Sequence, residues 1–260
     1  MSSQKPLIRT IHHLSCSGGS VLCKCIASMQ TTIVISEVHP DQLRYEFNPY
    51  DPIQLLLAQT NLGEDLQLRR QIFLKRIIDT EQILRNNKIN TVLRDHTHYD
   101  YLIPNNIESI HSKASLFEVI REYFEIYSVL SLRNPIDSYL SLVNNNWNNS
   151  ISSFEDYCSR VLLMLETYES LDALIIRYED FCIDPDKILK QICKKLKLNF
   201  SSDYHEKFFK YPMTGDSGRA GELKKIEQPL LRKIDASLHN EIIESKSFKV
   251  ISKKYSYKSR

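Results

Sequence analysis

The sequence predicts an α/β protein of three layers, in which helices cover both faces of a central parallel sheet. Two observations support this fold class. Short β-branched or apolar runs alternate with segments of helical spacing along the whole chain, and this alternation is typical of parallel strands joined by right-handed crossovers. The first apolar run, residues 7–14, also leads through a Gly/Ser turn directly into helical spacing.

Three strands are expected in the first half of the chain. The first is residues 7–14, the second is the β-branched run of residues 31–36, and the third is residues 90–94. A helix is expected directly after the Gly/Ser turn, because the apolar residues from Val21 onward have helical spacing. Further helices are expected at residues 53–60, 64–86 and 116–124.

The second half begins with the most strand-like segment. Residues 126–132 are a nearly continuous apolar run, which suits the middle of a parallel sheet. Pro135 then suits the first turn of a helix, and residues 173–178 predict a fifth strand. Further helices are expected at residues 136–143, 154–170, 185–196 and 229–241.

The chain shows no linker or internal repeat, so we expect one domain over residues 1–260. Its core would span residues 8–222, and residues 223–260 would form a C-terminal helix and a basic tail. Six Lys and Arg residues fall within the last fifteen positions. We interpret this segment as a tail exposed to solvent.

Composition limits the classes of function. The chain has 260 residues, of which 42% are hydrophobic and 25% charged, as in ordinary globular proteins. A formal net charge of +2 gives no indication of a nucleic-acid partner. No signal sequence and no apolar run of membrane-spanning length is visible, so we expect a cytoplasmic protein. The six cysteines lack metal-finger spacing, and we interpret them as small buried residues in a reducing compartment.

The turn after the first strand has the composition of an anion-binding loop. Gly18 and Gly19 allow a tight turn and close approach of the backbone to a ligand. The first turn of the following helix leaves N–H groups unpaired and partly positive, which suits phosphate or sulfate. The alternative is an ordinary strand-to-helix turn with Ser20 as the helix cap.

Two further polar residues of interest follow the apolar strand of residues 126–132. Arg133 stands at its end, and Ser141 comes eight residues later in the opening turns of a helix. A guanidinium and a hydroxyl in these positions can converge on one phosphate. Ligands of parallel sheets bind beyond the carboxyl ends of the strands, so we expect residues 16–20, 95–98 and 133–135 to share one edge of the sheet.

With these motifs the chain resembles the sulfotransferases that use 3'-phosphoadenosine 5'-phosphosulfate (PAPS). Residues 17–20 (SGGS) match their first loop, and residues 133–141 (RNPIDSYLS) match their R-[ND]-P-x-D-x-x-x-S signature. Residues 177–181 (RYEDF), followed by Asp184-Pro185, are similar to a third segment, and residues 215–219 (GDSGR) to a late glycine-arginine loop. The motifs stand in the family's order over about residues 8–222.

The resemblance implies a P-loop NTPase-like version of the α/β fold and a sulfuryl transfer without a metal. PAPS would be the donor, adenosine 3',5'-bisphosphate the product, and a small molecule or saccharide with a hydroxyl or amine the acceptor. Donor-binding residues carried over from the family motifs are Cys16, Ser17, Gly18, Gly19, Ser20, Val21 and Leu22 for the 5' end, and Arg133, Ser141 and Arg219 for the 3'-phosphate.

The resemblance also implies a proton acceptor after the third strand. When residues 94–96 are aligned with the family's Lys-Thr-His, His96 becomes the base, and histidine titrates near neutral pH. His98 is the alternative, because Thr97-His98 is an equally short match. Asp95 would orient the histidine or replace it.

Two features depart from the family pattern. Val21 and Leu22 stand where many members have an aromatic residue that stacks on adenine. Cys16 stands where many members have a lysine or arginine that steadies the leaving group, and Lys24 is the candidate to replace that charge. Two other functions remain open. A P-loop small-molecule kinase is the first, although the chain lacks the second glycine and the magnesium-binding hydroxyl of that loop. A non-catalytic nucleotide-binding protein of the same fold is the second.

Overall fold

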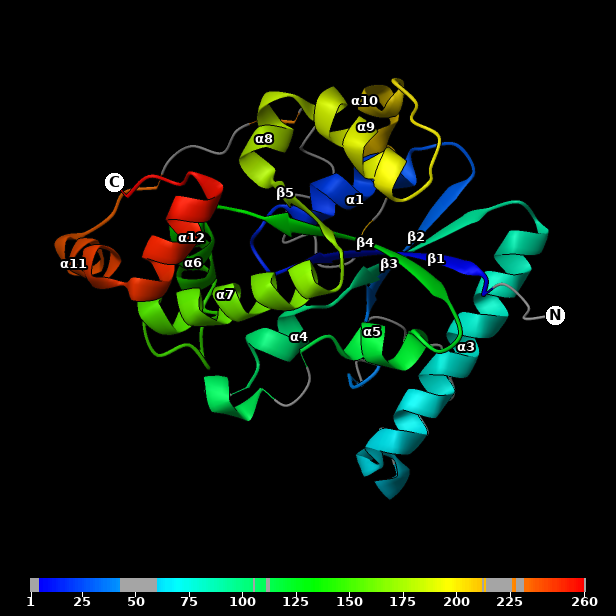
Figure 1. Cartoon of the computed structure of the whole chain (residues 1–260), viewed down its shortest axis with the longest axis horizontal. Coiled ribbons are helices and arrows are strands. Elements are labelled where there is room, and N and C mark those ends of the chain that lie inside the picture. Colours follow the sequence, from blue (N-terminus) through cyan, green and yellow to red (C-terminus); the bar gives the residue numbers. More distant parts are fainter. Residues whose placement is uncertain are drawn as a thin grey trace.

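The computed structural model describes residues 5–42, 60–104, 106–110, 113–211, 213, 226–227 and 232–259. In this part of the chain, five parallel strands form one sheet in the order β2-β3-β1-β4-β5 (Figure 1). The strands are β1 (Leu7–His13), β2 (Thr32–Val38), β3 (Asn90–Asp95), β4 (Glu125–Leu132) and β5 (Leu174–Arg177).

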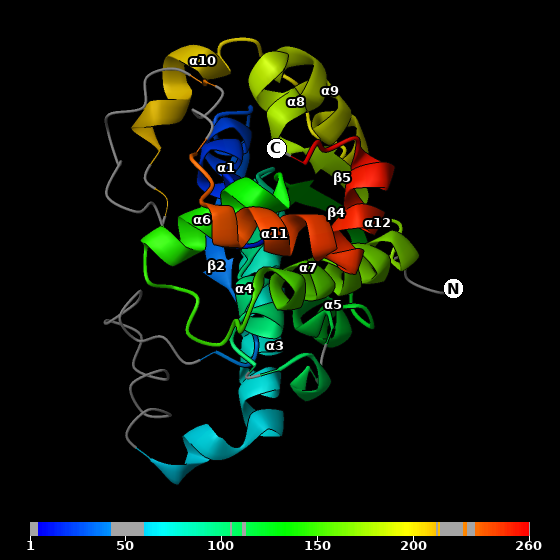
Figure 2. The ribbon, with the colours of Figure 1, turned by 90° about the vertical axis from the view of Figure 1, so that its left-hand side faces the viewer.

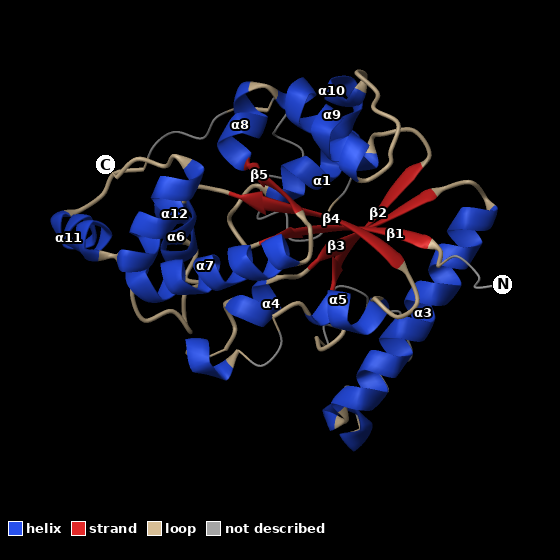
Figure 3. Ribbon diagram, viewed as in Figure 1, coloured by secondary structure: helices blue, strands red, loops and turns tan. Residues whose placement is uncertain are grey.

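Helices cover both faces of the sheet (Figure 3). On one face lie α1 (Gly19–Ala27), α8 (Tyr178–Ile183), α9 (Pro185–Lys195) and α10 (Tyr204–Lys207). On the other lie α3 (Leu66–Asn86), α4 (His98–Tyr101), α5 (Ser115–Ile120) and α7 (Phe154–Ser170). At the carboxyl ends of β4 and β5 stand α6 (Pro135–Asn144), α11 (Ala236–Glu244) and α12 (Lys246–Tyr255), which Figure 2 shows in front. The described residues also form the short 3-10 helices η2 (Asn61–Glu64), η3 (Ile107–Ser109) and η4 (Phe208–Lys210).

The core is divided by the sheet because successive side chains of a strand point to opposite faces. In β3, Val92 packs in the cluster with Leu22 of α1 and Leu189 of α9. Its neighbour Leu93 packs instead with Ile77 of α3. Both β3 residues are completely buried, so the central strands are covered on both faces, as a parallel sheet requires. The predicted three-layer α/β class is thus confirmed.

All five predicted strands are present, with ends shifted by at most two residues. One shift changes an element: Tyr178, expected to end the fifth strand, begins α8. The helix expected at residues 116–124 ends at Ile120. The helix expected at residues 53–60 lies outside the described residues.

The expected C-terminal helix is present with a later start, but the interpretation of the last fifteen residues as a tail exposed to solvent was wrong. The helix expected at residues 229–241 is α11, which begins at Ala236, and the expected tail contains a second helix, α12. Ser245 caps α12 by accepting a hydrogen bond from the backbone N–H of Phe248. Phe248 and Ile251, three residues apart, are buried in the cluster that includes α7. This helical spacing of apolar residues, rather than the surrounding lysines, decides the structure.

The described helices contain no stretch that is both long and apolar enough to cross a membrane.

Candidate functional site

The turn between β1 and α1 (residues 14–18) has a backbone that few side chains tolerate. Cys16 and Gly18 are both left-handed, with φ of 65° and 82°. The hydroxyl of Ser17 donates to the Leu14 carbonyl at 2.6 Å and so closes the turn. Gly18 is the N-cap of α1, and no described side chain caps this end of the helix. The N–H groups of the first helical turn therefore keep their capacity to bind an anion.

Two aromatic rings explain why residues 18 and 19 are glycines. A Cβ built on Gly18 would lie 2.2 Å from the Cε2 atom of Tyr178, and one on Gly19 would lie 2.2 Å from the Nε2 atom of His13. Contacts this short do not occur between packed atoms. Packing alone thus requires both glycines, so their presence is not in itself evidence for a phosphate-binding loop.

Arg94 of β3 lies beneath the first turn of α1 and was used in the sequence analysis only to align a motif. Its Nη2 donates to Oγ of Ser20 at 3.1 Å, and its Nη1 donates to Oγ of Ser36 at 2.9 Å. The carboxylate of Glu37 lies 3.5 Å from Nη2. Because Arg94 fills an acceptor position on the Ser20 oxygen, the Ser20 hydroxyl proton remains available to a ligand.

His13 supports the same turn as a neutral ring. Burial, followed by the Arg94 cation, lowers the pKa of His13 to about 3. Its Nε2 accepts a hydrogen bond from Nε of Arg94 at 2.8 Å, so the proton is on Nδ1, which donates to the Leu14 carbonyl at 3.0 Å. The ring therefore connects Arg94 to the turn and has a structural role.

The structure brings together the two strand-end motifs that the sequence placed 117 positions apart. Nη1 of Arg133, directly after β4, donates to the carbonyl oxygen of Cys16 at 2.8 Å. The guanidinium carbon also lies 5.8 Å from the centroid of the Tyr178 ring. Arg133 is 9% exposed, and its Nε is a buried donor with no hydrogen-bond partner among the described residues. An unsatisfied guanidinium donor beside an anion-binding turn suits a bound phosphate.

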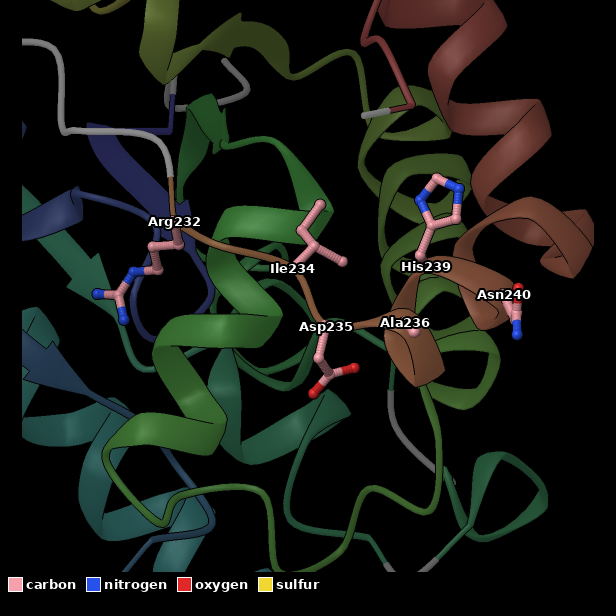
Figure 4. A pocket seen from close by; sticks show the side chains of 6 residues that line it. All are labelled: Arg232, Ile234, Asp235, Ala236, His239 and Asn240. Carbon is pink, nitrogen blue, oxygen red and sulfur yellow. The ribbon is translucent and has the colours of Figure 1, made fainter.

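Ser141 contacts an arginine, Arg232, that is not among the residues predicted for the site. Its Oγ, on α6, accepts a hydrogen bond from Nη2 of Arg232 at 3.2 Å. Arg232 precedes α11 and lines a pocket with a volume of about 410 Å³. In Figure 4 its guanidinium points away from His239 and Asn240, two other lining residues. The expected arginine, Arg219, lies outside the described residues.

The carboxyl end of β3 contains a buried polar network. Oδ2 of Asp95 lies 2.8 Å from Nδ1 of His12, and it accepts hydrogen bonds from the hydroxyls of Thr97 at 2.9 Å and Tyr168 at 3.3 Å. Burial by itself would raise the pKa of Asp95, but the hydrogen bond and charge of His12 outweigh this effect and the pKa is lowered. Asp95 is 1% exposed, so it belongs to the interior of the sheet edge.

The two candidate bases lie side by side. The rings of His96 and His98 are stacked with their centroids 5.6 Å apart, and both residues are at most 9% exposed. The backbone N–H of His96 donates to the carbonyl of Val38 at 3.0 Å, while His98 is the first residue of α4. The structure therefore keeps both histidines as candidates.

Three other residues of the predicted site, Lys24, Leu22 and Val21, lie on α1. Lys24 is buried in the last turn of α1. Its backbone lies about 7.5 Å further along the helix axis than Gly19, a distance comparable to the length of a lysine side chain. The side chain of Leu22 is completely buried in the core, and its backbone N–H donates to the Gly18 carbonyl at 3.4 Å. Val21 is half-buried and packs against the same cluster.

No protein-family model matches the chain, and no curated protein matches its sequence. Among the solved structures that resemble it, two sulfotransferase domains cover almost its full length. The sulfotransferase domain of the Synechococcus PCC 7002 olefin synthase is 14% identical, with a TM-score of 0.54 and coverage of 99% of this chain and 98% of that chain. The sulfotransferase domain from the curacin biosynthetic pathway is 18% identical, with a TM-score of 0.52 and coverage of 99% and 100%. The chain therefore has the fold of these sulfotransferase domains.

Proposed function

We propose that this chain is a PAPS-dependent sulfotransferase whose donor binds between the β1–α1 turn and the start of α6. The observation that carries the proposal is the hydrogen bond from Arg133 to the Cys16 carbonyl. It joins two motifs that, in the family the sequence resembles, bind opposite ends of the same nucleotide. The shared fold supports the proposal at the level of architecture.

The described side chains fit such a donor. The unpaired N–H groups of the first turn of α1 and the hydroxyl of Ser20 would bind the 5' phosphosulfate. Nε of Arg133, buried and without a described partner, would bind the 3'-phosphate together with Ser141 and Arg232, which already contact each other. Arg219 remains part of this proposal. The bound donor supplies an activated sulfuryl group.

In the proposed transfer, the acceptor oxygen or nitrogen forms a bond to sulfur while the bond from sulfur to the phosphate oxygen breaks. The ring nitrogen of His96 or His98 takes the acceptor proton. Negative charge grows on the leaving phosphate and is stabilised by the first-turn N–H groups and the Ser20 hydroxyl. Arg94 adds a buried positive charge beneath Ser20, although Glu37 lies close enough to offset part of it. We propose a saccharide or other hydroxylated small molecule as acceptor.

A non-catalytic nucleotide-binding protein is the second candidate, and the residue at position 16 favours it. Cys16 provides no cation for the leaving group, and the backbone of Lys24 is in the last turn of α1 rather than in the loop. This candidate predicts that the bisphosphate binds and that no acceptor is sulfated.

Ligand-induced shifts in melting temperature test the proposal. The protein would be heated alone and with adenosine 3',5'-bisphosphate, PAPS or ATP with magnesium, and PAPS turnover would be followed with a panel of hydroxyl and amine acceptors. The bisphosphate should stabilise the unmodified protein and the control Arg121→Ala, whose side chain is 59% exposed. It should not stabilise Arg133→Ala.

Absence of any bisphosphate effect on the unmodified protein would overturn the proposal. A shift that appears only with ATP and magnesium would favour the kinase. Binding without turnover on the whole panel would favour the non-catalytic candidate.

A further inference from the structure

Arg133 is the residue on which the proposed donor site depends, and the backbone on both sides of it is held by the same two side chains. The N–H of Asn134 donates to Oε1 of Glu179 at 2.8 Å. The hydroxyl of Tyr257 lies 3.1 Å from Oε2 of that carboxylate and 3.3 Å from the carbonyl oxygen of Leu132. Leu132 and Asn134 are the immediate neighbours of Arg133.

Tyr257 reaches this point because of the backbone that follows α12. Ser256 is left-handed, with φ of 55°, and reverses the chain after the helix. The N–H of Tyr257 then donates to the carbonyl of Ser252 at 3.1 Å. In Figure 2 the red segment after α12 lies beside β5. The guanidinium carbon of Arg177, the last residue of β5, lies 4.8 Å from the centroid of the Tyr257 ring.

The chemistry of Tyr257 and Glu179 suits a lasting attachment of the backbone on both sides of Arg133. We call these two side chains the clamp. Burial raises the pKa of Tyr257 above its ordinary value, so its hydroxyl stays protonated and remains a donor at neutral pH. Its single proton is shared between a carboxylate and a carbonyl, and hydrogen bonds to carboxylates are the stronger kind. The ring is 7% exposed and packs in the core cluster of α7 and α12. The hydroxyl is therefore held in place by the packing of α12.

We propose that Tyr257 and Glu179 are positioning residues that fix the backbone at Arg133 and so hold its guanidinium against the Cys16 carbonyl. The inference rests on the proposed function for its effect on donor binding, but the clamp itself concerns the protein without ligand. A small displacement of Arg133 would misalign both its bond to the turn and its Nε, and small misplacements of binding groups are costly.

Tyr257→Phe tests the clamp because it removes one hydroxyl and keeps the ring and its contact with Arg177. The matched control is Tyr255→Phe. Tyr255 also donates to a glutamate, Glu169, at 2.6 Å, but this bond joins α12 to α7 away from Arg133. A merely structural role of the C-terminal segment would make the two variants behave alike.

Two measurements separate the clamp from the proposed function. Hydrogen exchange of the Asn134 amide in the ligand-free protein should be about tenfold faster in Tyr257→Phe and unchanged in Tyr255→Phe. The dissociation constant of adenosine 3',5'-bisphosphate, measured by calorimetry, should rise about tenfold in Tyr257→Phe only. Glu179→Gln, which keeps the side-chain size, should act in the same direction as Tyr257→Phe.

Equal exchange of the Asn134 amide in the two tyrosine variants would overturn the clamp, and so would an equal loss of affinity. If the unmodified protein does not bind the bisphosphate, the proposed function fails, while the exchange measurement still decides whether Tyr257 holds the backbone at Arg133.

Discussion

Two neighbouring parts of the sheet edge, the ends of β1 and β4 and the end of β3, carry polar residues in different ways. At β1 and β4, Arg133 donates to the Cys16 carbonyl and keeps a buried donor, Nε, that no described residue uses. At β3, His12, Thr97 and Tyr168 all contact Oδ2 of Asp95, while Oδ1 is buried without a hydrogen-bond partner among the described residues. The unused atom is a positively charged donor in the first case, which suits an anionic ligand, and a carboxylate acceptor in the second, which does not.

The difference shows what a short motif specifies. In the proposed donor site, the motifs at β1 and β4 bind through backbone N–H groups and one long guanidinium, so the position of the residues in the chain nearly determines their proposed role. The polar residues after β3 act through short side chains, whose role depends on what buries them. Separate measurements of donor binding, turnover and stability therefore test whether the two parts of the sheet edge have these different roles.

The largest expected effect concerns the β3 end. His96→Ala should lower turnover about a hundredfold, because general-base catalysis commonly contributes at least that factor, and it should leave bisphosphate affinity unchanged. Turnover on an acceptor found in the panel and calorimetry with the bisphosphate would be measured together. His98→Ala decides between the two stacked rings, and His205→Ala, on exposed α10, is the control. If neither His96→Ala nor His98→Ala lowers turnover, the end of β3 contributes no base to the reaction.

A smaller effect is expected from Asp95→Asn. Loss of the charged acceptor within the buried network should lower the free energy of unfolding by about 2 kcal/mol at pH 7. The pKa of folded Asp95 is lowered, so its contribution is present above the unfolded value of about 3.9 and is lost as pH falls through the lower folded value. Urea unfolding from pH 7 to 3 should thus show a weaker acid dependence in the variant.

The exposed carboxylate of Asp79 provides the control, because Asp79→Asn should not change the acid dependence. An Asp95→Asn protein that is as stable as the unmodified one but inactive would contradict the structural role assigned to Asp95. Such a result would instead assign Asp95 a role in catalysis.

The smallest effect should come from Arg232→Ala. Its contact with Ser141 is long, at 3.2 Å, and the side chain is half-buried, so the affinity for the bisphosphate should fall only about fivefold. The loss should be clearly less than that of Arg133→Ala. Lys233→Ala, at the exposed neighbouring position, is the control in the same calorimetric titration. A loss as large as that of Arg133→Ala would show that the α11 side of the site is as important as the β4 side.

The sequence allowed the strands and the meeting of the Cys16 and Arg133 motifs to be predicted because these depend on local periodicity and on the common edge of a parallel sheet. The roles of Arg94 and Arg232 could not be predicted in this way, since each depends on a contact with a distant segment. The burial of Asp95 could not be predicted, because the exposure of a side chain is not visible in a motif. The helix α12 was not predicted, because its segment was interpreted from the lysines rather than from the helical spacing of Phe248 and Ile251.

The rings of His13 and Tyr178 have a further consequence for protein engineering. They fill the space that a Cβ on Gly19 or Gly18 would need, and Tyr178 comes from a helix that follows a different strand. A graft of residues 14–20 into another parallel sheet would therefore lose the shape of the turn. A graft that keeps the shape of the turn would have to include residues 14–20 together with His13 and Tyr178.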